Sequence, residues 1–316
     1  MRYCLKRIFE SIISLIIISF FSFAVIQLAP GDVSSMYVTP DMTQEEVQAV
    51  IERLGLDKSI PEQYFSWAKL AVKGDFGASM INHRPVGEQI MEKLPSTMLL
   101  MGISLVISLG LAIILGLIAG LKKDTFIDRI INFFTYLGIS IPSFWFGMVL
   151  IIVFSLKLGW LPSSGMHTVG DKSFIDLVKH LILPSLTLSI GNLAIFTKYI
   201  RSSTITQIDE EYVVTAISKG TSKTKVLFRH VFKNCLLPII TIVGMNLSSL
   251  VVGSFIIESI FGWPGLGTLG MSAITSRDYT MIMAYTMFSG TLYVFGNLLA
   301  DVLYSVVDPR IKLGSR

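Results

Sequence analysis

The chain has 316 residues, of which 52% are hydrophobic and only 15% are charged, and its mean hydropathy is +0.66. This composition is too apolar for an ordinary globular domain. The net charge of +4 comes without a basic patch interleaved with aromatic residues, so we expect no nucleic-acid partner. Several uncharged runs are long enough to cross about 30 Å of hydrocarbon as helices. We therefore expect an all-α, polytopic membrane protein embedded in a lipid bilayer.

The N-terminal apolar run is interpreted as a retained span. Basic Met1–Arg7 and apolar Ile8–Leu28 have the charge order of a signal peptide. The run of about twenty residues is too long for a typical signal-peptide core, and no small-x-small cleavage site follows it.

The hydropathy pattern predicts six transmembrane helices. The third run is long for one crossing, so we expect it to be tilted or to start before the bilayer, with Pro142 bending it. The predicted spans are Ile8–Leu28, Thr97–Leu121, Ile127–Leu156, Leu181–Ile200, Leu236–Ile260 and Met281–Val307.

Basic residues predict the orientation. Lys and Arg gather before the first span, between spans two and three, between spans four and five, and after span six. These positions share one side if the chain crosses six times, and basic residues favour the cytoplasm. We therefore expect both termini in the cytoplasm. Pro30–Ser96 on the opposite side holds ten acidic and six basic residues.

The external residues 30–96 are predicted to form a small helical insert. Thr43 and Glu46 form a capping-box pattern, and Pro61 suits the first turn of a second helix, over Pro61–Val72. So short a segment should pack on span ends or on a partner. The expected division is residues 1–29 as the first helix, 30–96 as the insert, 97–307 as the core domain of five transmembrane helices and 308–316 as a cytoplasmic tail.

The basic segment, Glu210–Ile239, is predicted to form two short cytoplasmic helices. The first covers Glu211–Lys219 and ends at Gly220, which tolerates positive φ. Thr221 or Ser222 can cap the second, which extends to about Asn234. Phe228 and Phe232 are candidate anchors to the bundle or to a partner.

Polar groups in the later spans have two interpretations each. Asn246, Ser248, Ser249 and Ser254 could face a pore or join helices by hydrogen bonds. Glu258 and Asp301 lie near predicted span ends, so we expect interfacial solvation, with a paired or functional carboxylate as the alternative.

Three further patterns concern packing and turns. Gly116-x-x-x-Gly120 favours close helix contact. Trp263-Pro264-Gly265 must turn tightly and is expected to dip into the outer leaflet, narrowing the external mouth. Trp145 and Trp160 are expected interface anchors.

The order of Thr215-Ala216, Gly220 and Leu237-Pro238 resembles the "EAA" coupling loop of the membrane subunits of bacterial ATP-binding-cassette (ABC) importers. Thr-Ala stands where the loop's namesake reads Glu-Ala-Ala. The resemblance extends almost end to end and is closest to the dipeptide, oligopeptide and nickel importer permeases. It is carried by Leu28-Ala-Pro-Gly-Asp32, Leu54-Gly-Leu-Asp57, Gly74-Asp-Phe-Gly77, Arg84-Pro-Val86, Ser140-Ile-Pro-Ser-Phe-Trp145, Leu158-Gly-Trp-Leu-Pro162, Phe261-Gly-Trp-Pro-Gly-Leu-Gly267, Arg277-Asp-Tyr279 and Asp308-Pro-Arg310.

The resemblance implies a permease subunit of the bacterial inner membrane that forms half of a translocation path. Its implied partners are a second, homologous permease in a heterodimer, two ABC ATPase subunits and an external solute-binding protein. It implies peptides as cargo, with nickel or another chelated metal as the alternative. The coupling loop (residues 201–235 and the proline that follows) would include Glu211, Tyr212, Thr215, Ala216, Lys219, Gly220, Arg229 and Pro238.

Catalytic and cofactor motifs are missing from the sequence. No G-x-x-x-x-G-K-S/T is present, so ATP and Mg would be used by the partner ATPases, and we expect no cofactor on this chain. The four histidines form no i, i+4 pair, and no metal site is predicted. An intramembrane enzyme and an ATP-independent channel are distant alternatives. The enzyme would need a nucleophile–base pair or a metal cluster in the spans.

Overall fold

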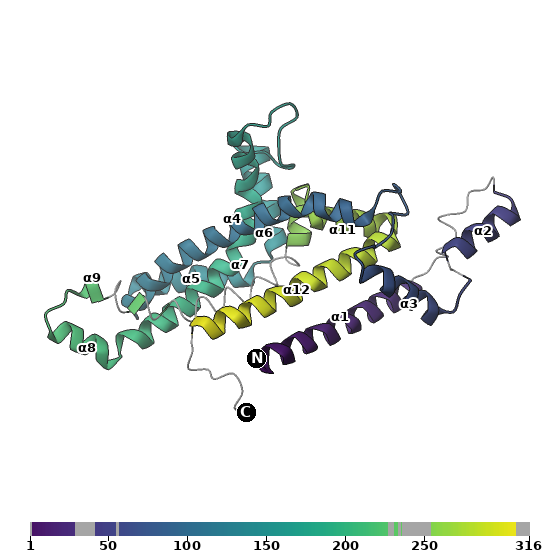
Figure 1. Ribbon diagram of the computed structural model, residues 1–316. Coiled ribbons are helices and arrows are strands. Elements are labelled where there is room, and N and C mark those ends of the chain that lie inside the picture. The colour runs from purple at the N-terminus through teal and green to yellow at the C-terminus, as the bar shows by residue number, and fades with distance from the viewer. Residues whose placement is uncertain are drawn as a thin grey trace. The chain divides into compact units, whose positions relative to one another are not determined.

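The computed structural model describes residues 2–28, 42–54, 57–226, 231, 232, 235 and 254–307. Those residues are predominantly helical and form no strand, only an isolated bridge between Ala78 and Pro85 (Figure 1). The all-α prediction is confirmed. The chain divides into two compact units: residues 1–95 with 268–294, and residues 96–267 with 295–316. The predicted domain boundaries follow membrane topology instead and stay predictions.

Four described helices are long and apolar enough to cross a bilayer, or up to five spans if a bent pair counts as one. The predicted fifth span, Leu236–Ile260, is described only over residues 254–260, which are helical. The remaining candidates are α1 (Arg2–Leu28), α4 (Val86–Leu121), α7 (Phe174–Ile208), α12 (Tyr279–Val307), and α5 (Phe126–Ser140) with α6 (Ser143–Leu150) and η2 (Ile151–Lys157).

Helix α4 starts earlier than the predicted Thr97. It begins at Val86 and continues through Pro95. The charged residues of its first turns interrupt the apolar run, so hydropathy alone places the start too late. Val86 and Ile90 are buried, which stabilises the added turns.

The third predicted span is sharply bent at the expected proline. The axes before and after the break differ by 102°. Ile141 is extended (ψ 126°), the conformation favoured before a proline, and Pro142 then opens α6. The segment therefore consists of two helical arms rather than one tilted rod.

In the first unit, the insert contains α2 (Gln44–Leu54) and α3 (Ile60–Ala71). The capping box is confirmed: the Thr43 N–H donates to Glu46 Oε2 at 2.8 Å, and the Glu46 N–H donates to Thr43 Oγ1 at 3.3 Å. Hydrogen bonds from the Thr43 backbone and hydroxyl lower the pKa of Glu46. Thr43 and Glu46 thus satisfy donors at the start of the helix.

The insert packs on span ends within its unit, as predicted. Tyr64 of α3 lies against Phe20 and Phe23 of α1, and its hydroxyl is 2.8 Å from the Ser19 hydroxyl. Buried Asp278, just before α12, accepts hydrogen bonds from Ser79 and Met80 of the insert. The short insert therefore relies on the spans of its own unit for its packing.

In the second unit, α4 and α7 make close backbone contact at Gly116 and Gly120. A Cβ added to Gly116 would lie 2.6 Å from Ile200 Cβ, and one on Gly120 would lie 2.6 Å from Thr204 Cβ. The predicted glycine-mediated contact is confirmed. Small residues permit such approach where lipid supplies no hydrophobic driving force between helices.

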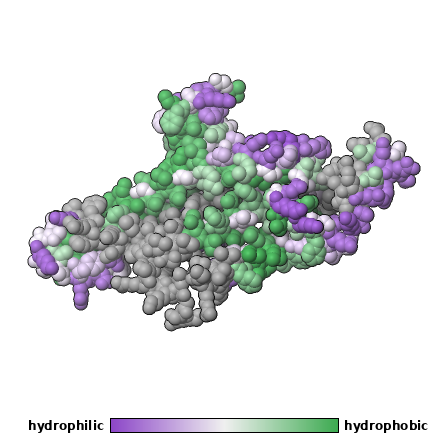
Figure 2. All heavy atoms as spheres, in the orientation of Figure 1, coloured by the Kyte–Doolittle hydropathy of each residue, from purple (hydrophilic) through white to green (hydrophobic). Residues whose placement is uncertain are grey.

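Hydrophobic side chains remain exposed along the candidate spans, and hydrophilic surface gathers over the insert and over the basic segment (Figure 2). Trp145 and Trp160 are 50% and 66% exposed, which agrees with the expected interface anchors. This distribution suits a chain surrounded by lipid.

We predict that Gly120→Ala destabilises the protein, although Ala is normally the better helix former. The added methyl meets Thr204 and the Arg201 carbonyl, and such overpacking costs about 1–3 kcal/mol. The measurement is thermal unfolding in detergent. Gly110→Ala is the matched control, because its Cβ meets nothing within 4 Å. Equal melting temperatures for the two variants would contradict the prediction.

Candidate functional site

The first part of the basic segment folds as predicted. Helix α8 covers Glu211–Ser218, and Gly220 follows with φ +82°. The Thr221 N–H donates to the Ala216 carbonyl at 3.1 Å, which closes the helix end. Helix α9 (Lys223–Val226) starts behind Ser222, whose hydroxyl accepts from the Lys225 N–H at 3.4 Å.

A small apolar core holds α8 in place. It consists of buried Val213, Val226, Val231 and Cys235, with Ala216 packed against it. The Tyr212 hydroxyl also donates to Gln207 Oε1 of α7 at 2.7 Å. Helix α8 is therefore fixed to the end of α7, and Ala216 faces this core.

The outer face of α8 carries two apolar residues that sequence reasoning missed. Val214 is 60% exposed and Ile217 is 44% exposed, and Thr215 and Lys219 are exposed beside them. The i, i+3 spacing of Val214 and Ile217, out of phase with buried Val213, was the available signal. This apolar face suits a groove on another protein.

Of the two candidate anchors to the bundle, the structure describes only Phe232. Phe232 packs against the core formed by Ala112, Leu117, Phe196 and Ile200, so its anchoring to the bundle is confirmed. Phe228, Arg229, Pro238, Asn246, Ser248 and Ser249 lie outside the described residues. Ser254 is described and is buried.

The Trp-Pro-Gly hairpin, Phe261–Gly267, is anchored in the second unit. Trp263 is fully buried against Leu100 and Leu181, and its indole N–H donates to the Ser96 carbonyl at 2.9 Å. The Trp263 side chain is therefore fixed, and the Pro264-Gly265 turn comes directly after it in the chain.

The buried carboxylate of Glu258 holds the C-terminal end of this hairpin. Glu258 is completely buried and accepts from the Thr97 hydroxyl at 2.8 Å and from the Gly267 N–H at 2.6 Å. The Thr97 hydroxyl oxygen also accepts from the Leu266 N–H at 2.7 Å. The expected interfacial solvation of Glu258 is thus wrong, and the paired alternative holds. The side chain of Asp301 is outside the described part of the chain.

The glycines of the hairpin have different roles. Gly262 adopts φ +55°, a left-handed turn conformation. Gly265 and Gly267 allow close approach instead: an added Cβ would clash with Glu258 Oε2 at Gly265, and would lie 2.6 Å from Phe255 Cα at Gly267. The hairpin is built around Glu258.

Two of the scattered histidines meet on one carboxylate. His167 Nδ1 lies 3.1 Å from Asp176 Oδ2, and His180 Nδ1 lies 3.4 Å from Asp176 Oδ1. Sequence reasoning missed this cluster because a loop separates His167 from α7. Among the residues that the structure describes, no group of His, Cys, Asp and Glu could hold a metal ion.

Residues 112–313 match the family described as "Binding-protein-dependent transport system inner membrane component", and residues 1–101 match the N-terminal component of such systems. The chain belongs to this family. It is a permease subunit of the ABC importers of the peptide and nickel group, located in the bacterial inner membrane. It is a transport component rather than an enzyme, and the family associates with ATPase and substrate-binding partners.

Relatives in this permease family align over nearly the full length. The oligopeptide transport system permease protein AppB of Bacillus subtilis (strain 168) is 40% identical over 98% of this chain and 99% of its own. A putative peptide permease of Brucella suis is 38% identical, and the glutathione transport system permease GsiC of Escherichia coli (strain K12) is 35% identical, each over 99% of both chains.

A solved structure supports the permease fold. A chain of the MetNI methionine ABC transporter, in an inward-facing conformation, matches with a TM-score of 0.51 over 68% of this chain and 95% of that chain. The sequence identity is 12%, so this likeness concerns the fold alone.

We predict that Thr97→Val destabilises the permease by about 1–3 kcal/mol, because it leaves the Leu266 N–H and Glu258 short of a buried partner. Thermal unfolding measures the loss. Thr97→Ser keeps the hydroxyl and should unfold close to the native temperature. The prediction fails if the two variants unfold alike.

Proposed function

We propose that this permease forms half of the translocation path of a peptide importer. The observation that carries the proposal is the match over nearly all of the chain to permeases named for oligopeptide, peptide and glutathione transport. The path for such a cargo would open between this permease and a partner permease.

The proposed assembly contains a second, homologous permease in a heterodimer, two ABC ATPase subunits and an external solute-binding protein. ATP and Mg would be used by the ATPase subunits, and this chain would bind no cofactor. Closure of the ATPases on ATP would switch the path between inward- and outward-facing states.

The coupling surface is proposed to be the outer face of α8. Val214, Thr215, Ile217 and Lys219 are exposed, whereas Val213 fixes the helix to its own core. A short helix that its own core holds in place can transmit a displacement through its apolar face without unfolding. Glu211, Tyr212, Ala216, Gly220, Arg229 and Pro238 complete the coupling loop in this proposal.

The path and its gate complete the proposal. Asn246, Ser248, Ser249 and Ser254 would line the path, and the Trp-Pro-Gly hairpin with Trp263, Pro264 and Gly265 would close its external mouth. Both termini and α8 would lie in the cytoplasm, because Lys and Arg concentrate on that side.

The coupling proposal is tested by co-purification of the ATPase subunits. A paired change, Val214→Asp with Ile217→Asp, should abolish co-purification, because it places charges in an apolar contact without touching the core of α8. Val169→Asp is the control, since Val169 is likewise an exposed apolar residue but lies in the loop before α7. Retention of the ATPases by the paired variant would refute this surface.

The cargo proposal is tested by uptake. Proteoliposomes or cells that contain the full transporter should accumulate labelled tri- and tetrapeptides in an ATP-dependent manner, and a chelated nickel ion should not compete. ATP-dependent nickel uptake without peptide uptake would replace peptide by metal as the cargo. Flux without ATP would indicate a channel.

A further inference from the structure

An ion pair joins α5 to α7 in the second unit. Asp128, in the first turn of α5, is 2% exposed. Its Oδ1 accepts from Arg201 Nε at 2.6 Å, and its Oδ2 accepts from Arg201 Nη2 at 2.7 Å. Two parallel bonds of this kind fix the geometry of both planar groups as well as their separation.

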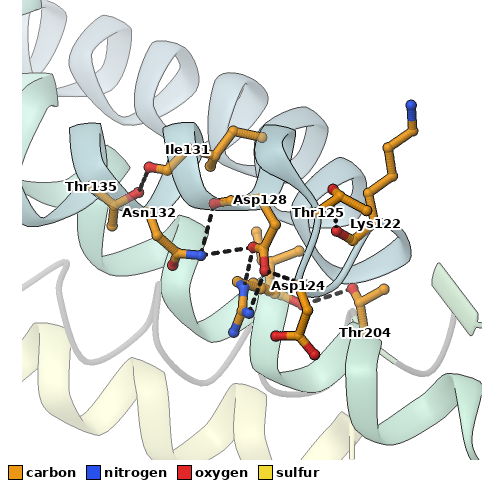
Figure 3. A network of polar contacts seen from close by, with 10 residues as sticks. Lys122, Asp124, Thr125, Asp128, Ile131, Asn132, Thr135 and Thr204 are labelled. Carbon is orange, nitrogen blue, oxygen red and sulfur yellow. Dashed lines mark hydrogen bonds and ion pairs between the residues drawn. The ribbon is translucent and has the colours of Figure 1, made fainter.

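The rest of the Asp128 carboxylate is satisfied by its own neighbourhood (Figure 3). The Asn132 amide donates to Oδ1 at 2.7 Å, and the Asp124 N–H donates to Oδ2 at 3.0 Å. Asp124 adopts φ +63°, a left-handed conformation that aims its N–H at Asp128. The turn between α4 and α5 is thus shaped around this carboxylate.

The same stretch of α7 contacts α4 as well. Gly116 approaches Ile200, and Gly120 approaches Thr204 and the Arg201 carbonyl. One turn of α7 therefore contacts both helices of the α4–α5 hairpin. It contacts α4 by close packing and α5 through the ion pair. Close packing alone permits sliding, whereas the bidentate pair sets the register between α5 and α7.

This turn of α7 also leads directly to the coupling surface. Thr204 Oγ1 lies 3.8 Å from Cys235 Sγ, and Cys235 belongs to the core beneath α8. Helix α7 continues without a break from Arg201 to Ile208, and α8 begins three residues later. Helix α7 therefore connects α8 directly with the turn that holds Asp128.

We propose that Asp128 and Arg201 are positioning residues that transmit ATPase-driven motion of α8 to the α4–α5 hairpin. This inference rests on the proposed coupling function of α8. The ion pair lies at the junction of the hairpin, α7 and the core beneath α8, which is the position that a transmitting contact requires. The pair makes these elements move as one body, so ATP hydrolysis and rearrangement of the spans stay linked.

The test compares ATP hydrolysis by the complete reconstituted transporter with and without its solute-binding protein loaded with trialanine. Asp128→Asn removes the charge but keeps the shape, and Arg201→Lys keeps the charge but loses the bidentate geometry. Each should lower the stimulation by the loaded binding protein about tenfold, a common size for coupling between sites. Basal hydrolysis and recovery of the assembly should stay near native values.

The double variant should be no worse than either single variant, because both remove one contact. Glu92→Gln is the matched control: it breaks the exposed Arg84–Glu92 ion pair and should leave stimulation unchanged. Native-like stimulation in Asp128→Asn would overturn the proposal, as would an equal loss in Glu92→Gln. If Asp128→Asn fails to accumulate in membranes, Arg201→Lys decides by the same criteria. Absence of stimulation in the native transporter would refute the proposed function instead.

Discussion

A polar or charged group that is removed from water, whether by lipid or by packed protein, must find its partners within the protein. This constraint shapes the second unit of the permease. Glu258 is enclosed by Thr97 and the amide of Gly267, and Asp128 is enclosed by Arg201, Asn132 and the amide of Asp124. Each carboxylate binds a segment that is distant in sequence, and each thereby fixes one structural element: the hairpin that leads into α11 (Leu266–Ser276), or the hairpin of α4 and α5.

Helix contacts in the permease follow from the same environment. Lipid chains are as apolar as leucine, so burial of apolar surface gives little drive for association between spans. Gly116 and Gly120 of α4 compensate by bringing backbones together, which increases dispersion contacts with Ile200 and Thr204. The ion pair beside them supplies the directionality that packing of small residues lacks.

Local patterns predicted much of the permease. Thr43 and Glu46 form the expected capping box, Pro142 bends the third span, and Gly220 ends α8 with positive φ. Each feature depends on residues within one or two turns of each other. The predicted start of α4 and the predicted solvation of Glu258 are wrong, because burial of Val86, Ile90 and Glu258 depends on distant segments. Asp176 with His167, and the outward face of Val214 and Ile217, were missed.

The sequence by itself determined the membrane class, the approximate location of the described spans and the family, because hydropathy, turn residues and motif order are properties along the chain. Only the tertiary structure decided which polar residues are partners. Thr97 with Glu258 and Asp128 with Arg201 are far apart in sequence, and the same residue types at span ends can equally be solvated at an interface. Proximity in three dimensions separates these cases, since a buried charge is tolerated only where its partners converge.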